Sequence, residues 1–507
     1  MKPSALLPPG SRRLYLICVH LAVGASLWGY NIGILSSILV HPGWRSALRN
    51  PSPSERGLVT GVYYAGTLLS YLLLSHPLAD WLGRRYAALA GTLVLSAGAG
   101  VMASAGGLGA MALGRLVMGL GVGVVSTSVP LYQSEIAPAR ERGKFVTMNH
   151  VGFIAGLATG LWVGYGMTYW TGPAGEYWGW RVSILLQMLP AAIFAIGLPF
   201  LPETPRWLME KGHANLARST LHYLREDTYP HEAVTRELLA MKSSRPRSPR
   251  QTSLSLTLSL VREPPLRARL WRAFLLQFMA QMCGATAMKY YLPTLLKALG
   301  LGTRLALMAG AAEMSLKIGM TVLEMWLIDR FGRRACLVGG SAVMGVAMLV
   351  NGALPLAYPN NASKPADVVC IVFIFIYAMG YSLGLGPAAW VYSSEIFPTA
   401  VRARGLNFAA AGGSIGSLIV SHIWPVGIAR FGSGIYFFFM AVNFICVPVI
   451  WLLYPETKGR PLEDMDAIFG VAGSQTPVRL DDGDESPANR QDELSSTSEE
   501  DAPLLNE

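Results

Sequence analysis

The chain has 507 residues, of which 52% are apolar and only 14% are charged. A soluble globular chain rarely sustains this balance, so the composition favours a membrane protein. The formal net charge of +10 does not indicate nucleic-acid binding, because the basic residues lie mostly between the apolar segments, where the positive-inside rule places them.

Twelve apolar segments are each long enough to cross a membrane, since the hydrocarbon layer is about 30 Å thick and needs roughly 20 residues of helix. Six segments precede a polar central stretch, at residues 14–40, 57–79, 86–106, 109–133, 143–167 and 182–201. Six segments follow it, at residues 270–298, 303–328, 335–356, 368–392, 404–429 and 434–454. We therefore expect an all-α membrane protein with twelve transmembrane helices.

This pattern divides the chain into five regions. An even number of spans places both termini on one side, and the basic connections favour the cytoplasm for that side. The end of the tail, from about residue 471, is acidic, rich in serine and poor in apolar residues, so we expect it to be disordered. The regions are an N-terminus (1–13), a first six-helix bundle (14–201), a linker with short helices (202–268), a second six-helix bundle (269–454) and a tail (455–507).

Polar motifs occur twice along the chain, in the same order and at a nearly constant offset. Several matched pairs of this kind indicate a duplicated bundle. Asp80-Trp-Leu-Gly-Arg-Arg85 follows the second span, and Asp329-Arg-Phe-Gly-Arg-Arg334 follows the eighth. The fourth and tenth spans end in Tyr132-Gln-Ser-Glu-Ile-Ala-Pro138 and Tyr392-Ser-Ser-Glu-Ile-Phe-Pro398, and the two halves close with Pro202-Glu-Thr-Pro-Arg206 and Pro455-Glu-Thr-Lys-Gly459.

With these motifs the chain resembles the sugar porter branch of the major facilitator superfamily, from Gly29 to Phe469. The motif detail is most similar to that of fungal members, for example in Asn149-His-Val-Gly-Phe-Ile-Ala-Gly156. The resemblance implies two pseudo-symmetric six-helix bundles, a substrate site between them, and alternating access by rocking.

Charged residues of the repeated motifs are expected at the cytoplasmic ends of both bundles. We expect them to form a gate network when that side is closed and to separate when it opens, so that the network biases the equilibrium between the two states. The alternative is that the arginines are only a topology signal. The expected network contains Asp80, Arg84, Arg85, Glu135, Arg142, Glu203, Arg206, Asp329, Arg333, Arg334, Glu395, Arg402 and Glu456.

Arg115 lies within the fourth span, where an ionisable residue is costly and is a functional candidate. In proton-coupled relatives the corresponding arginine neighbours an aspartate on the first span and often a carboxylate on the sixth. Here the resemblance places Asn31 and Gln187 at those coupling positions. Amides do not titrate, so both changes favour facilitated diffusion. The alternative is that Arg115 only binds these amides and backbone carbonyls as scaffold.

The resemblance also carries over a sugar site from the fifth, seventh and tenth spans. A sugar offers hydroxyls to polar partners and an apolar C–H face to an aromatic ring. Gln281 and Trp390 keep the residue types of the family, whereas His150 and Thr286 depart from them, which leaves the identity of the sugar open. The expected substrate-binding residues are His150, Gln281, Thr286, Lys289, Tyr290, Tyr291 and Trp390.

Two lysines remain inside the spans. We expect Lys317 to pair with Glu313, four residues earlier on the same helix. Lys289 has no local partner, so it either reaches the outer surface or meets an anionic substrate.

Four functions agree with these observations. The leading one is facilitated diffusion of a monosaccharide or related polyol. The second is proton-coupled symport of such a solute, with His150, His20 or Glu313 in place of the lost aspartate. The third is transport of an acidic relative such as quinate or a uronic acid, with Lys289 as its partner. The fourth is a sugar sensor that does not transport. We expect no enzyme activity, since no nucleophile, base or metal cluster accompanies the spans.

We expect the partners to be a small-molecule sugar or polyol and the lipid bilayer, with no cofactor, metal or nucleic acid. Asn361 begins an Asn-Ala-Ser acceptor for N-glycosylation on the outer side. The tail ends in an acidic stretch followed by Leu504 and Leu505, which resembles a dileucine sorting signal read by a clathrin adaptor. The plasma membrane is the expected location, with endosomal or vacuolar membrane as the alternative.

Overall fold

The computed structural model describes residues 9–138, 142–226, 228–243, 260–398 and 401–458. The expected disorder beyond residue 471 and the sorting signal at Leu504 and Leu505 lie outside the described residues. The same holds for the side chains of Arg142 and Asp329.

The first half contains six helical passes. A short helix, α2 (Pro42–Ala47), follows the first pass. The second pass contains a single π turn, and the sixth is interrupted near Gln187. The passes are α1 (Pro9–Ile38), α3 (Pro53–Leu69) with η1 (Ser70–Leu74) and α4 (Ser75–Leu82), α5 (Arg84–Ala103), α6 (Leu108–Ile136), α7 (Arg142–Met167), and α8 (Gly172–Leu185) with α9 (Met188–Gly197) and η2 (Leu198–Phe200).

The second half repeats this pattern after a linker of three short helices, α10 (Pro205–Glu210), α11 (Ala214–Arg225) and α12 (His231–Ser243). Short 3₁₀ turns, η3 (Pro359–Asn361) and η4 (Gly432–Gly434), lie between passes. The passes are α14 (Pro264–Met282) with α15 (Ala285–Ala298), α16 (Thr303–Phe331), α17 (Arg333–Ala357), α18 (Lys364–Leu383) with α19 (Pro387–Glu395), α20 (Arg402–Phe431) and α21 (Ile435–Leu453).

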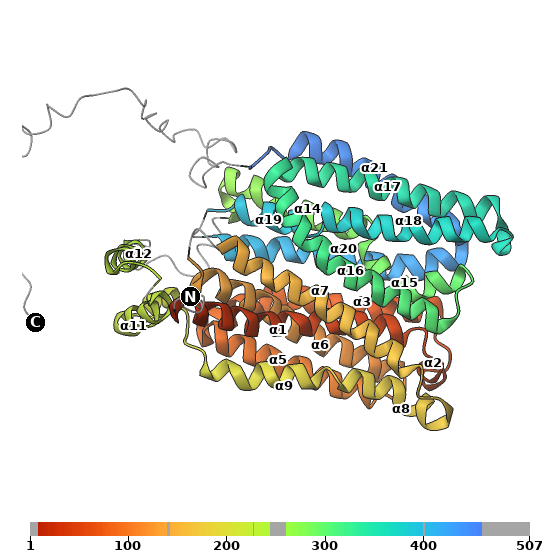
Figure 1. Cartoon of the computed structure of the whole chain (residues 1–507), viewed down its shortest axis with the longest axis horizontal. Coiled ribbons are helices and arrows are strands. Elements are labelled where there is room, and N and C mark those ends of the chain that lie inside the picture. The colour runs from red at the N-terminus through yellow and green to blue at the C-terminus, as the bar shows by residue number, and fades with distance from the viewer. Residues whose placement is uncertain (1–8, 139–141, 227, 244–259, 399–400, 459–507) are drawn as a thin grey trace, which may run out of the picture.

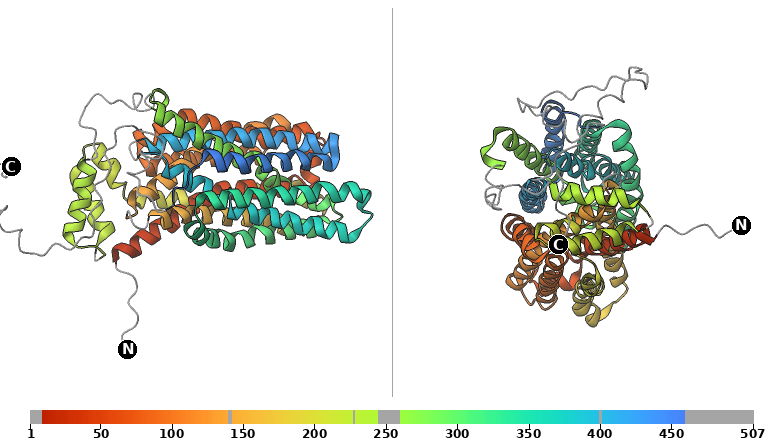
Figure 2. Two further views of the ribbon diagram at one scale, coloured as in Figure 1. Left: turned by 90° about the horizontal axis from the view of Figure 1, so that it is seen from above. Right: turned by 90° about the vertical axis from the view of Figure 1, so that its left-hand side faces the viewer.

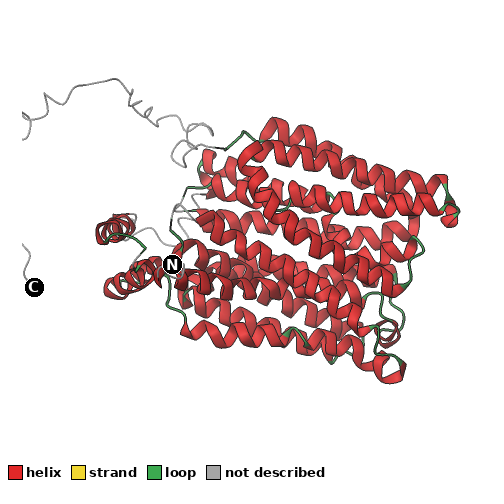
Figure 3. Ribbon diagram, viewed as in Figure 1, coloured by secondary structure: helices red, strands yellow, loops and turns green. Residues whose placement is uncertain are grey.

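The passes run alongside one another as one bundle of helices (Figure 1). Every regular element in the described part of the chain is a helix (Figure 3). The views in Figure 2 show α11 and α12 beyond one end of the bundle, beside the start of α1. We call this end the linker end and the opposite one the far end.

Nine helical stretches among the described residues are long and apolar enough to cross a membrane, and one of them contains both α20 and α21. The passes formed by α7 and by α14 with α15 are not counted in these nine stretches, but they run alongside them in the bundle (Figure 1). This arrangement agrees with the expected twelve-helix architecture. Sequence analysis started the sixth span at residue 182, whereas its helix begins at Gly172, because Gly and aromatic residues precede the apolar run.

Small residues bring helices of the same half into backbone contact. A Cβ on Gly29 of α1 would lie 1.9 Å from the carbonyl oxygen of Phe153 on α7, and one on Gly156 would lie 2.0 Å from that of Ser26. In a membrane, where burial of apolar surface does not drive helix association, such close packing is a main source of cohesion. Between the halves, α3 packs on α20 and α7 packs on α16.

The linker helices are attached to the start of α1. The backbone N–H of Gly10 donates to the carbonyl oxygen of Glu226 at 3.0 Å, and Ser11 bonds to the hydroxyl of Thr228. Arg13 pairs with Glu226, and its guanidinium lies 4.3 Å from the ring centroid of Tyr223. These contacts hold α11 against the first half at the linker end.

Candidate transport site

In the first half, the guanidinium of Arg84 is the centre of an ion-pair network at the linker end. Its Nη2 donates to Glu135 at 2.9 Å, while Asp80 and Glu210 lie 3.7 and 3.8 Å from guanidinium nitrogens. The backbone N–H of Arg84 donates to Glu203 at 3.1 Å. Because Arg84 and Glu135 are both buried, removing either one would take from the other its nearest opposite charge.

The second half repeats this arrangement around Arg333. Its Nη2 donates to Glu395 at 2.9 Å, and its backbone N–H donates to Glu456 at 3.0 Å. The hydroxyl of Thr457 donates to Glu395 at 2.6 Å, as the hydroxyl of Thr204 does to the equivalent carboxylate of the first half. The sequence repeat therefore corresponds to a repeat of structure.

At the linker end, the two central ion pairs each join helices of the same half. Arg84 on α5 meets Glu135 on α6, and Arg333 on α17 meets Glu395 on α19. Two halves that rock as rigid bodies would not separate these partners. These described pairs hold helix ends together within a half, and the separation of the wider network on opening stays a prediction.

The remaining glutamates of the repeat accept backbone N–H groups. Arg85 donates its N–H to Glu203 at 3.4 Å, and Arg334 donates its N–H to Glu456 at 3.0 Å. The pKa of Glu203 is raised, because burial outweighs the stabilisation of its charge by the N–H groups of Thr204 and of the two arginines that follow Gly83.

Other expected members of the network lie apart from these pairs. Arg206 is on α10 and interacts electrostatically with Glu210. The guanidinium of Arg402 donates to the carbonyl oxygen of Phe397 at 3.2 Å. Across the two halves, Asp80 and Arg404 interact electrostatically, so charged groups of the two halves meet at the linker end.

At the coupling position, Arg115 is fully buried and neutral groups hold its guanidinium. It donates to the side-chain oxygen of Asn31 on α1, to the carbonyl oxygen of Val59 on α3 at 3.2 Å, and to the hydroxyl of Tyr290 on α15 at 3.1 Å. Its Cζ lies 4.4 Å from the ring centroid of Tyr63. Within the described residues Arg115 makes no ion pair.

Gln187 does not join this group. It lies between α8 and α9, is fully buried, and donates through Nε2 to the carbonyl oxygen of Ile184 at 2.9 Å. Its Oε1 has no hydrogen-bond partner among the described residues. The structure therefore brings Asn31, but not Gln187, to Arg115.

Hydrogen bonds join the halves in the part of the bundle toward the far end. The hydroxyl of Tyr291 on α15 lies 3.1 Å from that of Thr60 on α3 and donates to the carbonyl oxygen of Ser421 on α20 at 3.2 Å. Further along α3, Thr67 bonds to Ser414 at 2.9 Å. Tyr291 is therefore engaged in a junction between halves, as Tyr290 is through Arg115, although sequence analysis assigned both to substrate binding.

Gln281 and Thr286 flank the break between α14 and α15. Gly284 in this break has a φ of +105°, a conformation that glycine adopts without strain. The hydroxyl of Thr286 donates to Gln281 at 3.0 Å and lies 3.0 Å from that of Ser417 on α20. The structure therefore brings polar groups of three helices together at the break in the seventh pass.

Trp390 and His150 provide the aromatic groups of the expected site. Trp390 lies on α19 after the break in the tenth pass and is 44% exposed within the protein chain. His150 on α7 is partly exposed, with its ring centroid 5.9 Å from that of Phe153.

Lys289 and Lys317 both lie near one aromatic ring. Their ammonium groups are 4.9 and 5.9 Å from the ring centroid of Tyr381 on α18, and both interact electrostatically with His150. Lys317 also pairs with Glu313 at 3.3 Å, as expected. Lys289 has no carboxylate partner among the described residues, so this cluster carries one more cation than it has anions.

Glu324 on α16 was not among the predicted site residues; it is fully buried and accepts the backbone N–H of Ala388 at 3.3 Å. An ionisable residue inside an apolar span was the signal that could have found it. The paired threonines Thr204 and Thr457 were not among them either, although both follow a glutamate in the repeated Pro-Glu-Thr motif.

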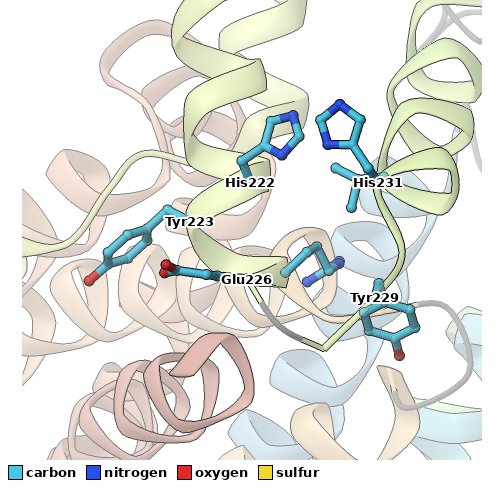
Figure 4. A pocket seen from close by; sticks show the side chains of 7 residues that line it. His222, Tyr223, Glu226, Tyr229 and His231 are labelled. Atoms are coloured by element: carbon cyan, nitrogen blue, oxygen red, sulfur yellow. The ribbon is translucent and has the colours of Figure 1, made fainter. Parts of the chain in front are cut away.

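A cavity of about 420 Å³ lies between α11 and α12 of the linker. In Figure 4 the rings of His222 and His231 face each other at its edge, with a centroid distance of 4.8 Å. Its charged groups already have partners, since Arg225 pairs with Glu237 at 2.9 Å and Glu226 pairs with the N-terminal segment. We therefore regard it as part of the linker attachment rather than the transport site.

Asn361 lies at the far end, in the turn after α17, where it is exposed. Its side-chain nitrogen donates to the carbonyl oxygen of Ala298 at 3.1 Å. The acceptor for N-glycosylation therefore lies at the end opposite to the linker.

The two repeated half-bundles, with polar groups at helix breaks between them, define a membrane transporter of the major facilitator fold. Residues 17–469 match the family model described as "Sugar (and other) transporter". The chain belongs to this family and is a multi-pass membrane protein that transports a sugar or a related substrate.

Similar proteins include several transporters. A protein named "Probable quinate permease" from Aspergillus niger is 28% identical over 476 residues, which cover 90% of this chain and 88% of that protein. The "MFS-type transporter criB" of Aspergillus cristatus is 30% identical, with 90% and 93% covered. The "Sugar transport protein MST3" of Oryza sativa subsp. japonica is 28% identical, with 91% and 92% covered.

Among solved structures, the fold is similar to that of the proton:xylose symporter XylE bound to 6-bromo-6-deoxy-D-glucose. The TM-score is 0.74 at 24% identity, and the match covers 91% of this chain and 100% of that one. An inward-open form of the xylose transporter XylE from E. coli matches with a TM-score of 0.71 at 23% identity, with 90% and 100% covered.

Proposed function

We propose that the protein carries a monosaccharide or related polyol down its own gradient by alternating access, without proton coupling. The observation that supports this proposal is the neutral surroundings of Arg115. An amide, a carbonyl and a hydroxyl occupy the donors of its guanidinium. No carboxylate stands beside Arg115 in the described structure, and the amide of Asn31 does not titrate, so this position lacks the group that would tie a proton to the conformational change.

We propose that the linker end is cytoplasmic. Arginines gather there in both halves, and the N-glycosylation acceptor at Asn361 is at the opposite end. We further propose residence in the plasma membrane, with a clathrin adaptor reading Leu504 and Leu505 as a candidate partner. The substrate would meet Gln281, Thr286 and Trp390, which lie at the breaks of the seventh and tenth passes.

Transport by the purified protein in liposomes tests the absence of coupling. Labelled hexoses, pentoses and polyols are supplied with and without an acid-outside pH gradient. We expect equilibration at the same final level in both cases, because the gradient of the solute is the only driving force. Accumulation above equilibrium that an uncoupler abolishes would overturn the proposal.

A second candidate is transport of a solute that bears a carboxylate. The cluster around Tyr381 favours it, because Lys289 lies beside Glu313–Lys317 without a counterion of its own in the described structure. A buried cation is costly unless it is paired, and the carboxylate of a substrate would supply the missing charge. The relatives named quinate permease agree with this candidate.

Lys289→Gln separates the two candidates. If the substrate is a carboxylate, we expect its Michaelis constant to rise about tenfold or more, because a charge-assisted bond is lost, while neutral sugars are unaffected. If the substrate is neutral, the variant should transport like the wild type. The assay is a competition panel of hexoses, polyols, quinate and galacturonate, with Lys364→Gln at the exposed far end as the matched control.

A further inference from the structure

The tenth pass is broken between α18 and α19 by Gly384, Leu385 and Gly386, which do not continue the helix. Pro387 begins α19 and has no N–H, so Ala388 offers the first N–H group of that helix. The N-terminus of a helix carries a partial positive charge that favours a nearby anion.

The carboxylate of Glu324 on α16 lies at this N-terminus. Its Oε1 accepts the N–H of Ala388 at 3.3 Å, and the residue is fully buried. Its Oε2 has no hydrogen-bond partner among the described residues. A buried carboxylate with one long hydrogen bond is only weakly compensated for its loss of water.

The opposite end of α19 is also held by a carboxylate. Glu395 pairs with Arg333 at 2.9 Å and accepts the hydroxyl of Thr457 at 2.6 Å. The helix has nine residues, and Trp390 of the expected substrate site lies between its two ends. A movement of α19 that follows the substrate would therefore change the surroundings of Glu324.

Other titratable groups near Glu324 do not neutralise it. Tyr381 on α18 and Cys336 on α17 interact with it electrostatically, and neither is cationic. On its own helix Lys317 lies seven residues earlier and pairs with Glu313. In the described structure, the N-terminus of α19 is thus the principal partner of the Glu324 charge.

We propose that Glu324 is a proton-binding site linked to the bend of the tenth pass. In its ionised form, the carboxylate caps α19 in the conformation described here. When α19 moves away, the carboxylate loses this partner, and binding a proton to one oxygen removes the unpaired charge. By thermodynamic linkage, protonation of Glu324 favours the conformation in which α19 is displaced.

This proposal rests on alternating access but not on the absence of proton coupling. Glu324 lies seven residues before Phe331 at the end of α16, which is about 10 Å from the linker end. A proton that enters and leaves at that end would change the rate of transport but would not drive accumulation of the solute. Liposome accumulation therefore tests the proposed function, and a measurement without solute tests this one.

Hydrogen–deuterium exchange of the detergent-solubilised full chain supplies that measurement. Exchange of the peptide covering Pro387–Glu395 is followed between pH 5.5 and 8.5 and corrected for intrinsic rates. We expect protection in the wild type to fall as the pH is lowered. In Glu324→Gln, which cannot ionise, we expect low protection at every pH, about tenfold below that of the wild type at pH 8.5.

Two further variants complete the test. Glu324→Asp keeps a titratable group, so its protection should still depend on pH, with a shifted midpoint. Asp367→Asn removes a carboxylate from the same pass at the far end and should keep the wild-type profile. Wild-type protection that does not vary with pH, or a Glu324→Gln profile identical to that of the wild type, would overturn the proposal.

Discussion

Two glycines allow the charged networks to form. Gly83 and Gly332 have φ of +89° and +91° with ψ near 165°, a region that is accessible almost only to glycine. A Cβ on either would lie 2.5 Å from a carboxylate oxygen of Glu203 or Glu456. The glycines therefore permit both the backbone turn and the approach of the carboxylate to the N–H groups that follow.

We expect Gly83→Ala to lower the free energy of unfolding by about 1–3 kcal/mol, because the new Cβ strains the backbone and displaces Glu203. Thermal unfolding in detergent measures the change. Gly109→Ala is the matched control, since a Cβ there meets nothing within 4 Å. Equal unfolding temperatures for both variants would contradict this account.

Sequence and structure agree well on individual charged residues, because the repeated motifs identify them independently of their partners. The resemblance placed Asn31 beside Arg115, and the two side chains are hydrogen-bonded. The contact of Arg115 with Tyr290 was not predicted, because it joins α6 to α15 across the two halves and no local pattern records such a contact.

At the scale of elements, apolar length predicts that a span exists but not that it is continuous. The residues Gly384-Leu-Gly-Pro387 account for the break in the tenth pass, since proline and glycine together interrupt a helix. The break in the seventh pass at Gly284 was not foreseen, because a single glycine is tolerated inside many spans. Both breaks lie beside the expected substrate residues. The break at Gly284, which the sequence did not predict, therefore lies within the expected substrate site.

Contacts within the second half hold both ends of the short helix α19. Glu395 fixes its C-terminal end to α17 through Arg333, while the N-terminal end contacts α16 through Glu324. A segment held by its ends can pivot without leaving its half. The expected motion of the tenth pass is therefore a local bend superimposed on the rocking of the two halves.

For the whole molecule, the described contacts close the bundle toward the far end. Tyr291 is 4% exposed and links α3, α15 and α20 there through its hydroxyl. Because these bonds cross between the halves, they exist only while this part of the bundle is closed. They therefore stabilise one state of the transport cycle relative to the other.

We expect Tyr291→Phe to shift the equilibrium away from this closed state by about three- to tenfold, the effect of losing roughly 1 kcal/mol of hydrogen bonding. Spin labels on Ala174→Cys and Lys364→Cys, both exposed at the far end, report the distance between halves. In Tyr291→Phe, the distribution of distances between the two labels should gain a component at longer distance. Tyr177→Phe, at an exposed position of α8, should leave it unchanged. An unaltered distribution in Tyr291→Phe would show that the hydroxyl does not hold the halves.

The attachment of the first helix to the linker has a consequence for how the protein is made. Ser11 bonds to Thr228, 217 residues later in the chain, so the start of α1 has no partner there when it first leaves the ribosome. At about 5–20 residues per second, the linker follows roughly ten to forty seconds later. During that interval α1 lacks its contacts with the linker, and Arg12 and Arg13 favour the cytoplasmic side for its first turn. Completion of the first half thus coincides with synthesis of the linker.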